Sequence, residues 1–153
     1  MMATFEEEAL EAYDRFLEEE QDKPVKYIKH DSWAHDDDAL YQLVNKRGMA
    51  YYGWYWLLVE LLAGRKGHYY NVSNEVGWRR LCRDMSCMCD IDIEDCKQFI
   101  TDLYEADLII REQFDELHRV AIMRLMRDAR TYAEDVAGKR LGAWKTNRKK
   151  VTK

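Results

Sequence analysis

The chain has 153 residues, enough for one domain with extensions but too few for a second domain of ordinary size. With 47% hydrophobic and 35% charged residues, the bulk of the chain is expected to fold. The longest apolar stretch, residues 49–63, is shorter than the roughly 20 residues that cross a bilayer, and no basic signal-peptide region opens the chain. We therefore expect a cytoplasmic protein without a membrane partner.

Charge is distributed unevenly along the chain, although the net charge is only -5. Residues 1–22 hold nine acidic side chains against one basic side chain, Arg15. Residues 138–153 hold seven basic side chains and no acidic one. Such asymmetry indicates a nucleic-acid-binding tail or pairing between the unlike ends. Two solvated ends that keep the protein soluble are the simpler alternative.

The N-terminal arm is predicted to be an acidic, amphipathic helix. Thr4 and Glu7 have the spacing of a capping box, and a helix cannot easily continue through Lys23, which precedes Pro24. We expect the apolar stripe of this arm to pack on its own domain, on a second copy or on a partner protein. The candidate partner-binding residues are Phe5, Leu10, Tyr13, Phe16 and Leu17.

Two consecutive helices are predicted after the arm. Aspartates at residues 36–38 supply a cap for the first, which has Lys46 and Arg47 in its last turn and ends at Gly48. The second, residues 49–63, is apolar nearly all round, which is typical of a helix buried at the centre of a fold. Gly53 would allow another backbone to approach closely. A base-stacking platform is the alternative, but the segment lacks Lys and Arg, which favours core packing.

A short strand and two further helices are expected next. The strand lies within residues 67–73, and Ser73 or Asn74 caps the helix that follows. In that helix Trp78, Leu81, Cys82 and Met85 form an inner stripe, and Arg79, Arg80 and Arg83 share the opposite face. Asp92 can cap the next helix, whose inner stripe is Ile93, Cys96, Phe99, Ile100 and Leu103.

Four cysteines fall within fifteen residues, at positions 82, 87, 89 and 96. Their C-x4-C-x-C-x6-C spacing departs from the paired ligands of structural zinc sites. We interpret them as reduced thiols, two of them on apolar helix faces, with zinc as the less favoured alternative. We expect no metal and no cofactor. We also expect no enzyme activity, because the four histidines are dispersed and no nucleophile motif or Gly-rich phosphate loop is present.

A hairpin and a last helix complete the predicted elements. Residues 107–111 favour a strand, residues 113–116 a turn and residues 118–122 a returning strand, although a helix from Glu116 would also suit this segment. We expect a helix from about Met123 to Lys139. Beyond Gly138 the basic tail is expected to be disordered when unbound.

This element order predicts a mainly α (α+β) fold: a winged helix-turn-helix with an extra N-terminal acidic helix and a C-terminal helix plus basic tail. The expected divisions are an N-terminal helical arm at residues 1–24, a winged-helix domain at residues 25–137 and a basic tail at residues 138–153.

Three segments of the chain form a recognisable series. They are the lead-in Lys26-Tyr27-Ile28-Lys29-His30-Asp31, residues 48–62 with Gly53-Trp54-Tyr55-Trp56 inside, and the ending Leu103-Tyr104-Glu105-Ala106-Asp107-Leu108-Ile109. Together they resemble the N-terminal winged-helix domain of phage and mobile-element replication initiators, the DnaD-like or replisome-organiser proteins. The resemblance covers roughly residues 26–130. It implies a bacterial or phage-encoded protein of replication initiation that binds origin DNA, associates with itself and recruits a helicase or helicase loader.

One departure from that pattern matters for DNA binding. In a DNA-reading helix-turn-helix the second helix brings Arg, Lys, Asn or Gln to the bases. Here residues 92–106 carry five acidic side chains against Lys97 alone. We therefore expect double-stranded DNA to be bound through phosphates by basic residues, mostly elsewhere. They are Arg79, Arg80, Arg83, Lys97, Arg111, Arg119, Lys145, Arg148, Lys149 and Lys150. The alternative is a winged-helix protein-interaction module or transcriptional regulator without a replication role.

Overall fold

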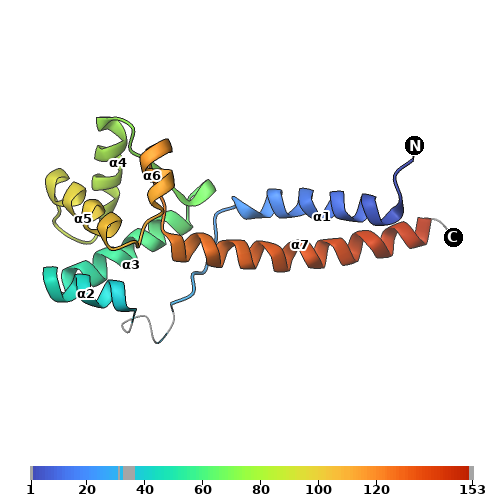
Figure 1. The fold of residues 1–153 in the computed structure, drawn as a ribbon, viewed down its shortest axis with the longest axis horizontal. Helices are drawn as coiled ribbons and strands as arrows, with labels where there is room; N and C mark the ends of the chain where they lie inside the picture. The colour runs from blue at the N-terminus through green and yellow to red at the C-terminus, as the bar shows by residue number, and fades with distance from the viewer. Residues whose placement is uncertain (1, 31, 33–36, 152–153) are drawn as a thin grey trace. The chain divides into compact units, whose positions relative to one another are not determined.

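The computed structural model describes residues 2–30, 32 and 37–151, and it divides into two compact units (Figure 1). One unit, the core unit, is Pro24–Met126, and the other, the helical pair, combines Met1–Lys23 with Arg127–Lys153. Within the described residues there are seven α-helices and one two-stranded sheet, so the protein is mainly helical. None of the described helices is both long and apolar enough to span a membrane.

The core unit contains most of the elements. In chain order they are α2 (Asp38–Arg47), α3 (Ala50–Ala63), the 3-10 turn η2 (Lys66–His68), β1 (Tyr70–Asn71), α4 (Glu75–Met85), α5 (Ile93–Glu105), α6 (Arg111–Leu117), β2 (Arg119–Val120) and the first turn of α7 (Met123–Val151).

Side-chain caps begin the helices where the sequence predicts them. The Asp37 carboxylate accepts a hydrogen bond from the Leu40 amide at 3.0 Å, and Asp92 accepts one from the Asp95 amide at 2.8 Å. For α4 the choice between Ser73 and Asn74 is resolved, because the Asn74 side chain accepts from the Gly77 amide at 3.0 Å. These caps satisfy amide groups that have no partner within their own helix.

The central position predicted for α3 is confirmed. Tyr55, Leu58 and Leu62 are almost completely buried, and the Tyr51 and Trp54 rings pack edge-on against Phe99 of α5. The close backbone approach expected at Gly53 is wrong, since a Cβ atom there would meet nothing within 4 Å. Close approach occurs at Gly77 instead, where a Cβ atom would lie 2.0 Å from the Asn71 carbonyl oxygen. Glycine at position 77 lets α4 pack directly on β1.

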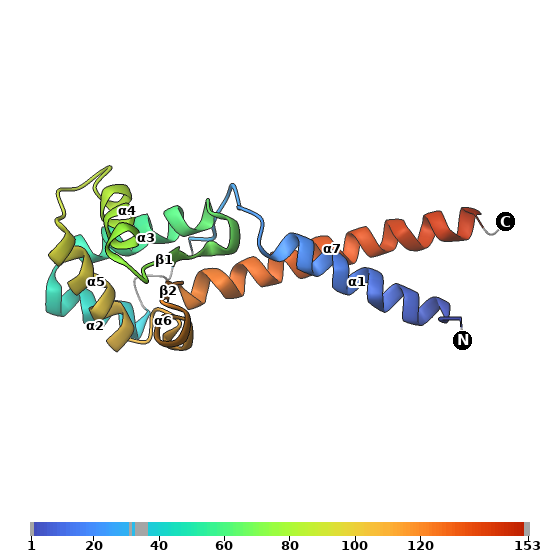
Figure 2. The ribbon, with the colours of Figure 1, turned by 90° about the horizontal axis from the view of Figure 1, so that it is seen from above.

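The predicted hairpin is only partly present. β1 pairs antiparallel with β2, so that Tyr70 lies opposite Val120 and Asn71 opposite Arg119 (Figure 2). Ile109 forms one isolated antiparallel bridge with Ile122 in place of the strand expected at residues 107–111.

The turn expected at residues 113–116 is also wrong, because the helix α6 occupies that segment. The Phe114 ring packs on Tyr104 with centroids 5.5 Å apart, which anchors α6 against the end of α5. Arg111, the first residue of α6, donates hydrogen bonds to the carbonyl oxygens of Tyr104 and Glu105. Tertiary contacts of this kind outweigh local turn preferences.

The helical pair consists of α1 (Phe5–Gln21) and residues 127–151 of α7, which lie antiparallel (Figures 1 and 2). Phe5 at the start of α1 stacks at a tilt on Trp144, and Phe16 packs near Ala137. The capping box predicted for α1 is present, with reciprocal hydrogen bonds between Thr4 and Glu7.

The structure differs from the disordered tail expected beyond Gly138, because α7 continues as a helix to Val151. Ala137, Leu141 and Trp144 recur at the spacing of one helix face, and this face packs on α1. The expectation of disorder rested on the basic side chains of the tail. The apolar side chains of the same segment pack on α1, and this packing keeps the segment helical.

Candidate nucleic-acid interface

Three arginines lie on the solvent-facing side of α4, opposite the fully buried Leu81 and Met85. Arg79 and Arg80 form no hydrogen bond or ion pair with any residue that the structure describes. Arg83 lies 3.6 Å from the Asp84 carboxylate, and its side chain remains 76% exposed. This face of α4 therefore presents three guanidinium groups, each with donors available to an external anion.

Other contacts engage the carboxylates that belong to α4. Glu75 pairs with Lys97 of α5 at 2.9 Å, and Asp84 accepts a hydrogen bond from the Tyr70 hydroxyl at 2.7 Å. Burial, reinforced by this hydrogen bond, raises the pKa of the Tyr70 phenol, which therefore stays protonated and keeps donating at neutral pH. The arginines are left with little acidic compensation from their own helix.

The outward face of α5 is acidic, as the sequence predicts, but one of its five acids has a different role. Glu94, Asp95 and Glu105 are exposed, and Asp92 caps the helix. Asp102 is buried, with 4% of its surface exposed. The acidic surface of α5 is therefore smaller than the sequence suggests, although its sign is unchanged.

Asp102 joins three helices through one carboxylate. It accepts hydrogen bonds from the Tyr51 hydroxyl of α3 at 2.7 Å, from the Arg47 guanidinium of α2 at 3.1 Å, and from Gln98 of α5 at 3.0 Å. Burial by itself raises the pKa of this carboxyl, but the hydrogen bonds from Tyr51, Arg47 and Gln98 outweigh it and hold the pKa below its ordinary value. Asp102 is thus an ionised group that binds α2, α3 and α5 together.

Two of the predicted DNA-binding cations are engaged inside the core unit. Lys97 pairs with Glu75, and its ammonium lies 5.7 Å from the Trp78 ring centroid. Arg111 pairs with Asp107 at 2.9 Å besides its hydrogen bonds to carbonyl oxygens at the end of α5. Both residues therefore stabilise contacts between segments, which reduces their freedom to bind phosphate.

Arg119 occupies a different environment, beside the two-stranded sheet. Its guanidinium lies 4.1 Å from the Tyr69 ring centroid, and the Arg65 guanidinium lies 4.0 Å from that of Tyr70. Arg65 also donates to the Tyr69 carbonyl oxygen at 3.0 Å. The sequence interpretation missed Arg65, although a basic residue four positions before the pair Tyr69-Tyr70 was a usable signal. Arginine–aromatic pairs of this kind can also contact nucleotides.

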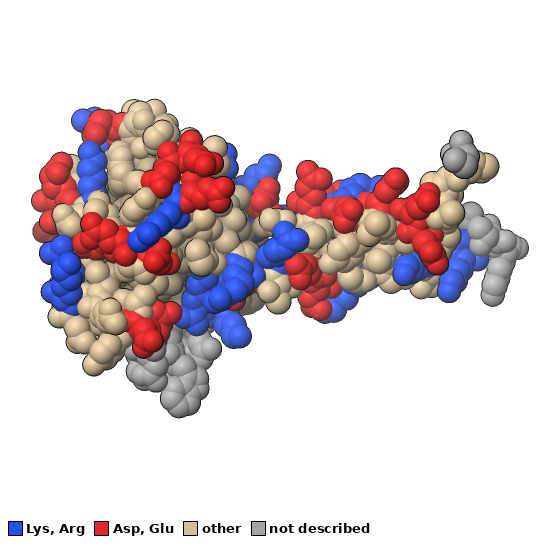
Figure 3. Space-filling model, in the orientation of Figure 1, with Lys and Arg blue, Asp and Glu red and all other residues tan. Residues whose placement is uncertain are grey.

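The remaining predicted cations, Lys145, Arg148, Lys149 and Lys150, are exposed on α7 and belong to the helical pair. Arg148 forms an ion pair with Glu8 of α1, and its guanidinium lies 5.1 Å from the Trp144 ring centroid. Arg140, which the sequence interpretation did not select, donates to Glu19 at 2.8 Å and to Glu20 at 2.9 Å. Acidic side chains gather over α1 and basic ones over the end of α7 in Figure 3. Pairing between the unlike ends, one of the alternatives left open by the sequence, is present in the structure.

The structure also places the predicted partner-binding stripe of α1. Phe16 is buried beside Ala137 of α7, and Tyr13 and Leu17 are half-buried against the same small cluster. The Phe5 ring centroid lies 5.6 Å from that of Trp144, although Phe5 stays 42% exposed, and Leu10 is 63% exposed. Much of the predicted stripe is therefore occupied within the chain's own helical pair.

The cysteines are free thiols in varied environments. Cys82 donates to the Ile91 carbonyl oxygen at 3.4 Å and Cys89 to that of Met85 at 3.0 Å, while Cys87 is exposed. Burial raises the pKa of the Cys96 thiol to about 12, which keeps it protonated. Across the described part of the chain, no group of three or more His, Cys, Asp and Glu side chains is arranged to hold a metal ion.

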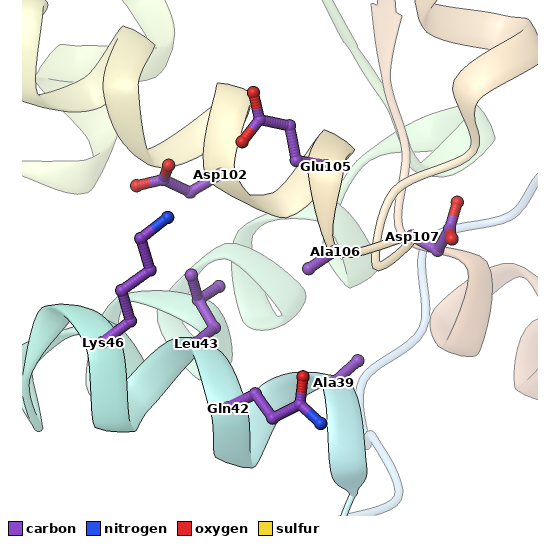
Figure 4. Close-up of a pocket in the computed structure, with 8 residues that line it drawn as sticks. All are labelled: Ala39, Gln42, Leu43, Lys46, Asp102, Glu105, Ala106 and Asp107. Carbon is purple, nitrogen blue, oxygen red and sulfur yellow. The ribbon is translucent and has the colours of Figure 1, made fainter.

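An open cleft of about 340 Å³ lies between α2 and the end of α5 (Figure 4). It is lined by Ala39, Gln42, Leu43, Lys46, Asp102, Glu105, Ala106 and Asp107. The Lys46 side chain extends toward the Asp102 carboxylate, which already has three hydrogen-bond donors. Its lining combines one lysine, three carboxylic acids, one amide and three apolar side chains.

Most of the core unit's sequence matches a known protein family. A family model described as Lin1244/Lin1753-like, N-terminal, matches residues 27–120, more than half of the chain. The chain therefore belongs to the Lin1244/Lin1753-like family, which falls in the group of DnaD-like phage proteins. No curated protein and no solved structure matches the chain. The matched residues run from the lead-in to β2 and so lie within the core unit.

Proposed function

We propose that the core unit is a winged-helix domain that binds double-stranded DNA in replication initiation of the phage or mobile-element type. The order α3, β1, α4, α5, Ile109 and β2 supports this fold, with β1 paired to β2 and Ile109 bridged to Ile122. In this assignment α4 and α5 are the helix-turn-helix, and α6 occupies the position of the wing loop. Membership in the DnaD-like group supports the same assignment.

The observation that carries the proposal is the arginine face of α4. Arg79 and Arg80 have no partner among the described residues, and Arg83 is mostly exposed. Phosphate binding releases counterions and supplies affinity that does not depend on sequence. The exposed acids of α5, by contrast, would repel phosphates in a major groove. We therefore assign DNA contact to α4 and phosphates rather than to base reading by α5.

The proposed role is binding rather than catalysis. A helicase or helicase loader is the expected protein partner, and self-association is expected as part of initiator assembly. The acidic outward face of α5, with Glu94, Asp95 and Glu105, is free to contact a basic protein surface while α4 holds DNA. That face is also the reason to retain the second candidate, a protein-interaction module or transcriptional regulator without a replication role.

Reversing Arg79, Arg80 and Arg83 together to glutamate is expected to weaken duplex binding on the order of a hundredfold in moderate salt. If three phosphate contacts are lost, the slope of log affinity against log salt falls by about 2.7, at about 0.9 per contact. Because the contacts are to phosphates, the loss should be similar for unrelated duplex sequences. Fluorescence anisotropy with labelled duplexes over a salt series measures both quantities.

The matched control reverses Lys26, Lys29 and Lys66, which are also exposed in the core unit and change the net charge equally. This control should keep most of the affinity and the salt slope. Both variants should keep a native melting temperature, because exposed substitutions usually change stability within about 0.5 kcal/mol each. Equal losses of duplex affinity in both variants would show that net charge, and not the α4 arginines in particular, determines binding. A natural protein that binds no duplex would favour the protein-interaction candidate.

A further inference from the structure

We propose that the basic C-terminal half of α7 is a second binding site for nucleic-acid backbone, and that α1 occupies this site as an intramolecular competitor. The proposal rests on the proposed function, because duplex DNA is the external ligand in both. It concerns the helical pair alone, since α1 and residues 127–151 of α7 belong to one compact unit.

Carboxylates of α1 take the place that phosphates would take on α7. Arg140 donates through its two terminal nitrogens to Glu19 at 2.8 Å and to Glu20 at 2.9 Å. Arg148 forms its ion pair with Glu8. A guanidinium group held by two acidic oxygens is the arrangement by which arginine binds phosphate. Arg140 and Arg148 are therefore anion-binding groups, and in this structure the anions they bind are carboxylates of α1.

Aromatic rings support both arginines from the apolar seam of the pair. The Arg140 guanidinium lies 4.2 Å from the Phe16 ring centroid, and that of Arg148 lies 5.1 Å from the ring centroid of Trp144. Trp144 belongs to the same helix as its arginine and would stay in place if α1 moved. The support on Arg148 is therefore preorganised for another anion.

The negative charge of α1 also opposes phosphate binding at those described residues of α7 that form no ion pair with α1. Eight acidic residues lie within α1 against Arg15 as its one basic residue. Lys145 and Lys150 are exposed on the basic half of α7, where α1 lies alongside. While α1 is docked, its negative field weakens the attraction of those lysines for a phosphate backbone.

The attachment of α1 is weak enough to be displaced. Its buried core with α7 is small, consisting of Ala12, Phe16 and Ala137 with partly buried neighbours. Exposed ion pairs contribute little to stability and are screened by salt. A hydrogen bond from Lys23 outweighs the opposing effect of burial and lowers the pKa of Glu20, which keeps this competitor ionised at neutral pH. A DNA backbone offers many phosphates to exchange for the three carboxylates.

The test compares two triple variants with the same change in net charge. Glu8→Gln, Glu19→Gln and Glu20→Gln together remove the acids that pair with α7. Glu6→Gln, Glu11→Gln and Glu18→Gln together remove acids of α1 that form no ion pair with any described residue. Anisotropy titrations of the full chain with labelled duplex, over a salt series, give affinity and salt slope for each.

The first variant is expected to bind duplex about tenfold more tightly at low salt, with a slope steeper by up to about 1.8 for the two released arginines. The second should change affinity by less than about threefold and leave the slope unchanged, because the arginines stay paired. Equal behaviour of the two variants would overturn the proposal and leave the α4 interface intact. Loss of duplex binding by every protein, the natural one included, would overturn both proposals.

Hydrogen exchange supplies a second readout on the natural protein. Saturating duplex should reduce the protection of the α1 amides while the protection of α4 and α5 is kept or increased. Unchanged protection of α1 in a protein that demonstrably binds duplex would show that α1 is a permanent part of the fold rather than a competitor.

Discussion

Replacing Gly77 with alanine is expected to destabilise the core unit by about 3 kcal/mol, although alanine is the better helix former by about 1 kcal/mol. The added Cβ atom would lie 2.0 Å from the Asn71 carbonyl oxygen, which is backbone and cannot rotate away. Relief requires α4 to move from β1, and this movement would disturb the pairing of Tyr70 with Val120. Urea unfolding followed by circular dichroism measures the loss.

Gly53→Ala is the matched control for this effect. Gly53 also lies inside a helix, but a Cβ atom there meets nothing within 4 Å. Because only the helix preference of alanine acts at this position, the control should gain up to about 1 kcal/mol. A Gly77→Ala protein as stable as the Gly53→Ala protein would show that α4 does not pack on β1 as closely as described.

Asp102→Ala is expected to lower the free energy of unfolding by about 2–4 kcal/mol. The substitution leaves the buried Tyr51 hydroxyl without its acceptor, which by itself is worth about 1–3 kcal/mol. It also removes the ionic partner of Arg47 and leaves unfilled the buried space that the Asp102 side chain occupies. The side chain of Arg47 is 36% exposed and can return to solvent, which keeps the effect below that of a fully buried ion pair. Glu105→Gln, an exposed change on the same helix, should stay within about 0.5 kcal/mol.

The same residue predicts a specific dependence of stability on pH. The folded protein holds the pKa of Asp102 below its ordinary value of 3.8, so the unfolded chain takes up this proton first as pH falls. The contribution of Asp102 is therefore fully present above 3.8 and is lost as pH falls through the lower folded pKa. The difference in stability between the natural protein and Asp102→Ala should shrink over that window. A difference that is constant with pH would mean that the ionised carboxylate is not what stabilises the network.

Local patterns predicted α2, α3, α4 and α5 of the core unit, because each has apolar residues at helical spacing, and α2, α4 and α5 also begin at a side-chain cap. The caps of α1 and α5, the C-terminal stop of α2 at Gly48 and the opposed faces of α4 all follow from spacing. The start of the last helix at Met123 was predicted as well. The match over residues 27–120 shows the Lin1244/Lin1753-like N-terminal family, which belongs to the DnaD-like/phage-protein group, and the replication role that the resemblance implies stays a prediction.

The sequence predictions were wrong where a side chain contacts a residue that is distant in the chain. Asp102 has the same local pattern as the exposed acids of α5, and only the positions of Tyr51 and Arg47, over fifty residues earlier, make it a buried acceptor. The helix α6 replaces the turn expected at residues 113–116, because Arg111 and Phe114 both contact Tyr104 near the end of α5. Burial of a polar group depends on partners that no local window contains.

The amino-acid sequence by itself determined every α-helix except α6 and the end of α7, the sign of the charge at each end and the basic face of α4, because these depend on spacing along one helix. Only the tertiary structure decided how the unlike ends are used. The apolar stripes of α1 and α7 are each too small to be buried alone, so their pairing depends on antiparallel contacts across more than a hundred residues. Those contacts place Glu8, Glu19 and Glu20 on the arginines of α7, so that a tail expected to be disordered becomes half of a helical pair.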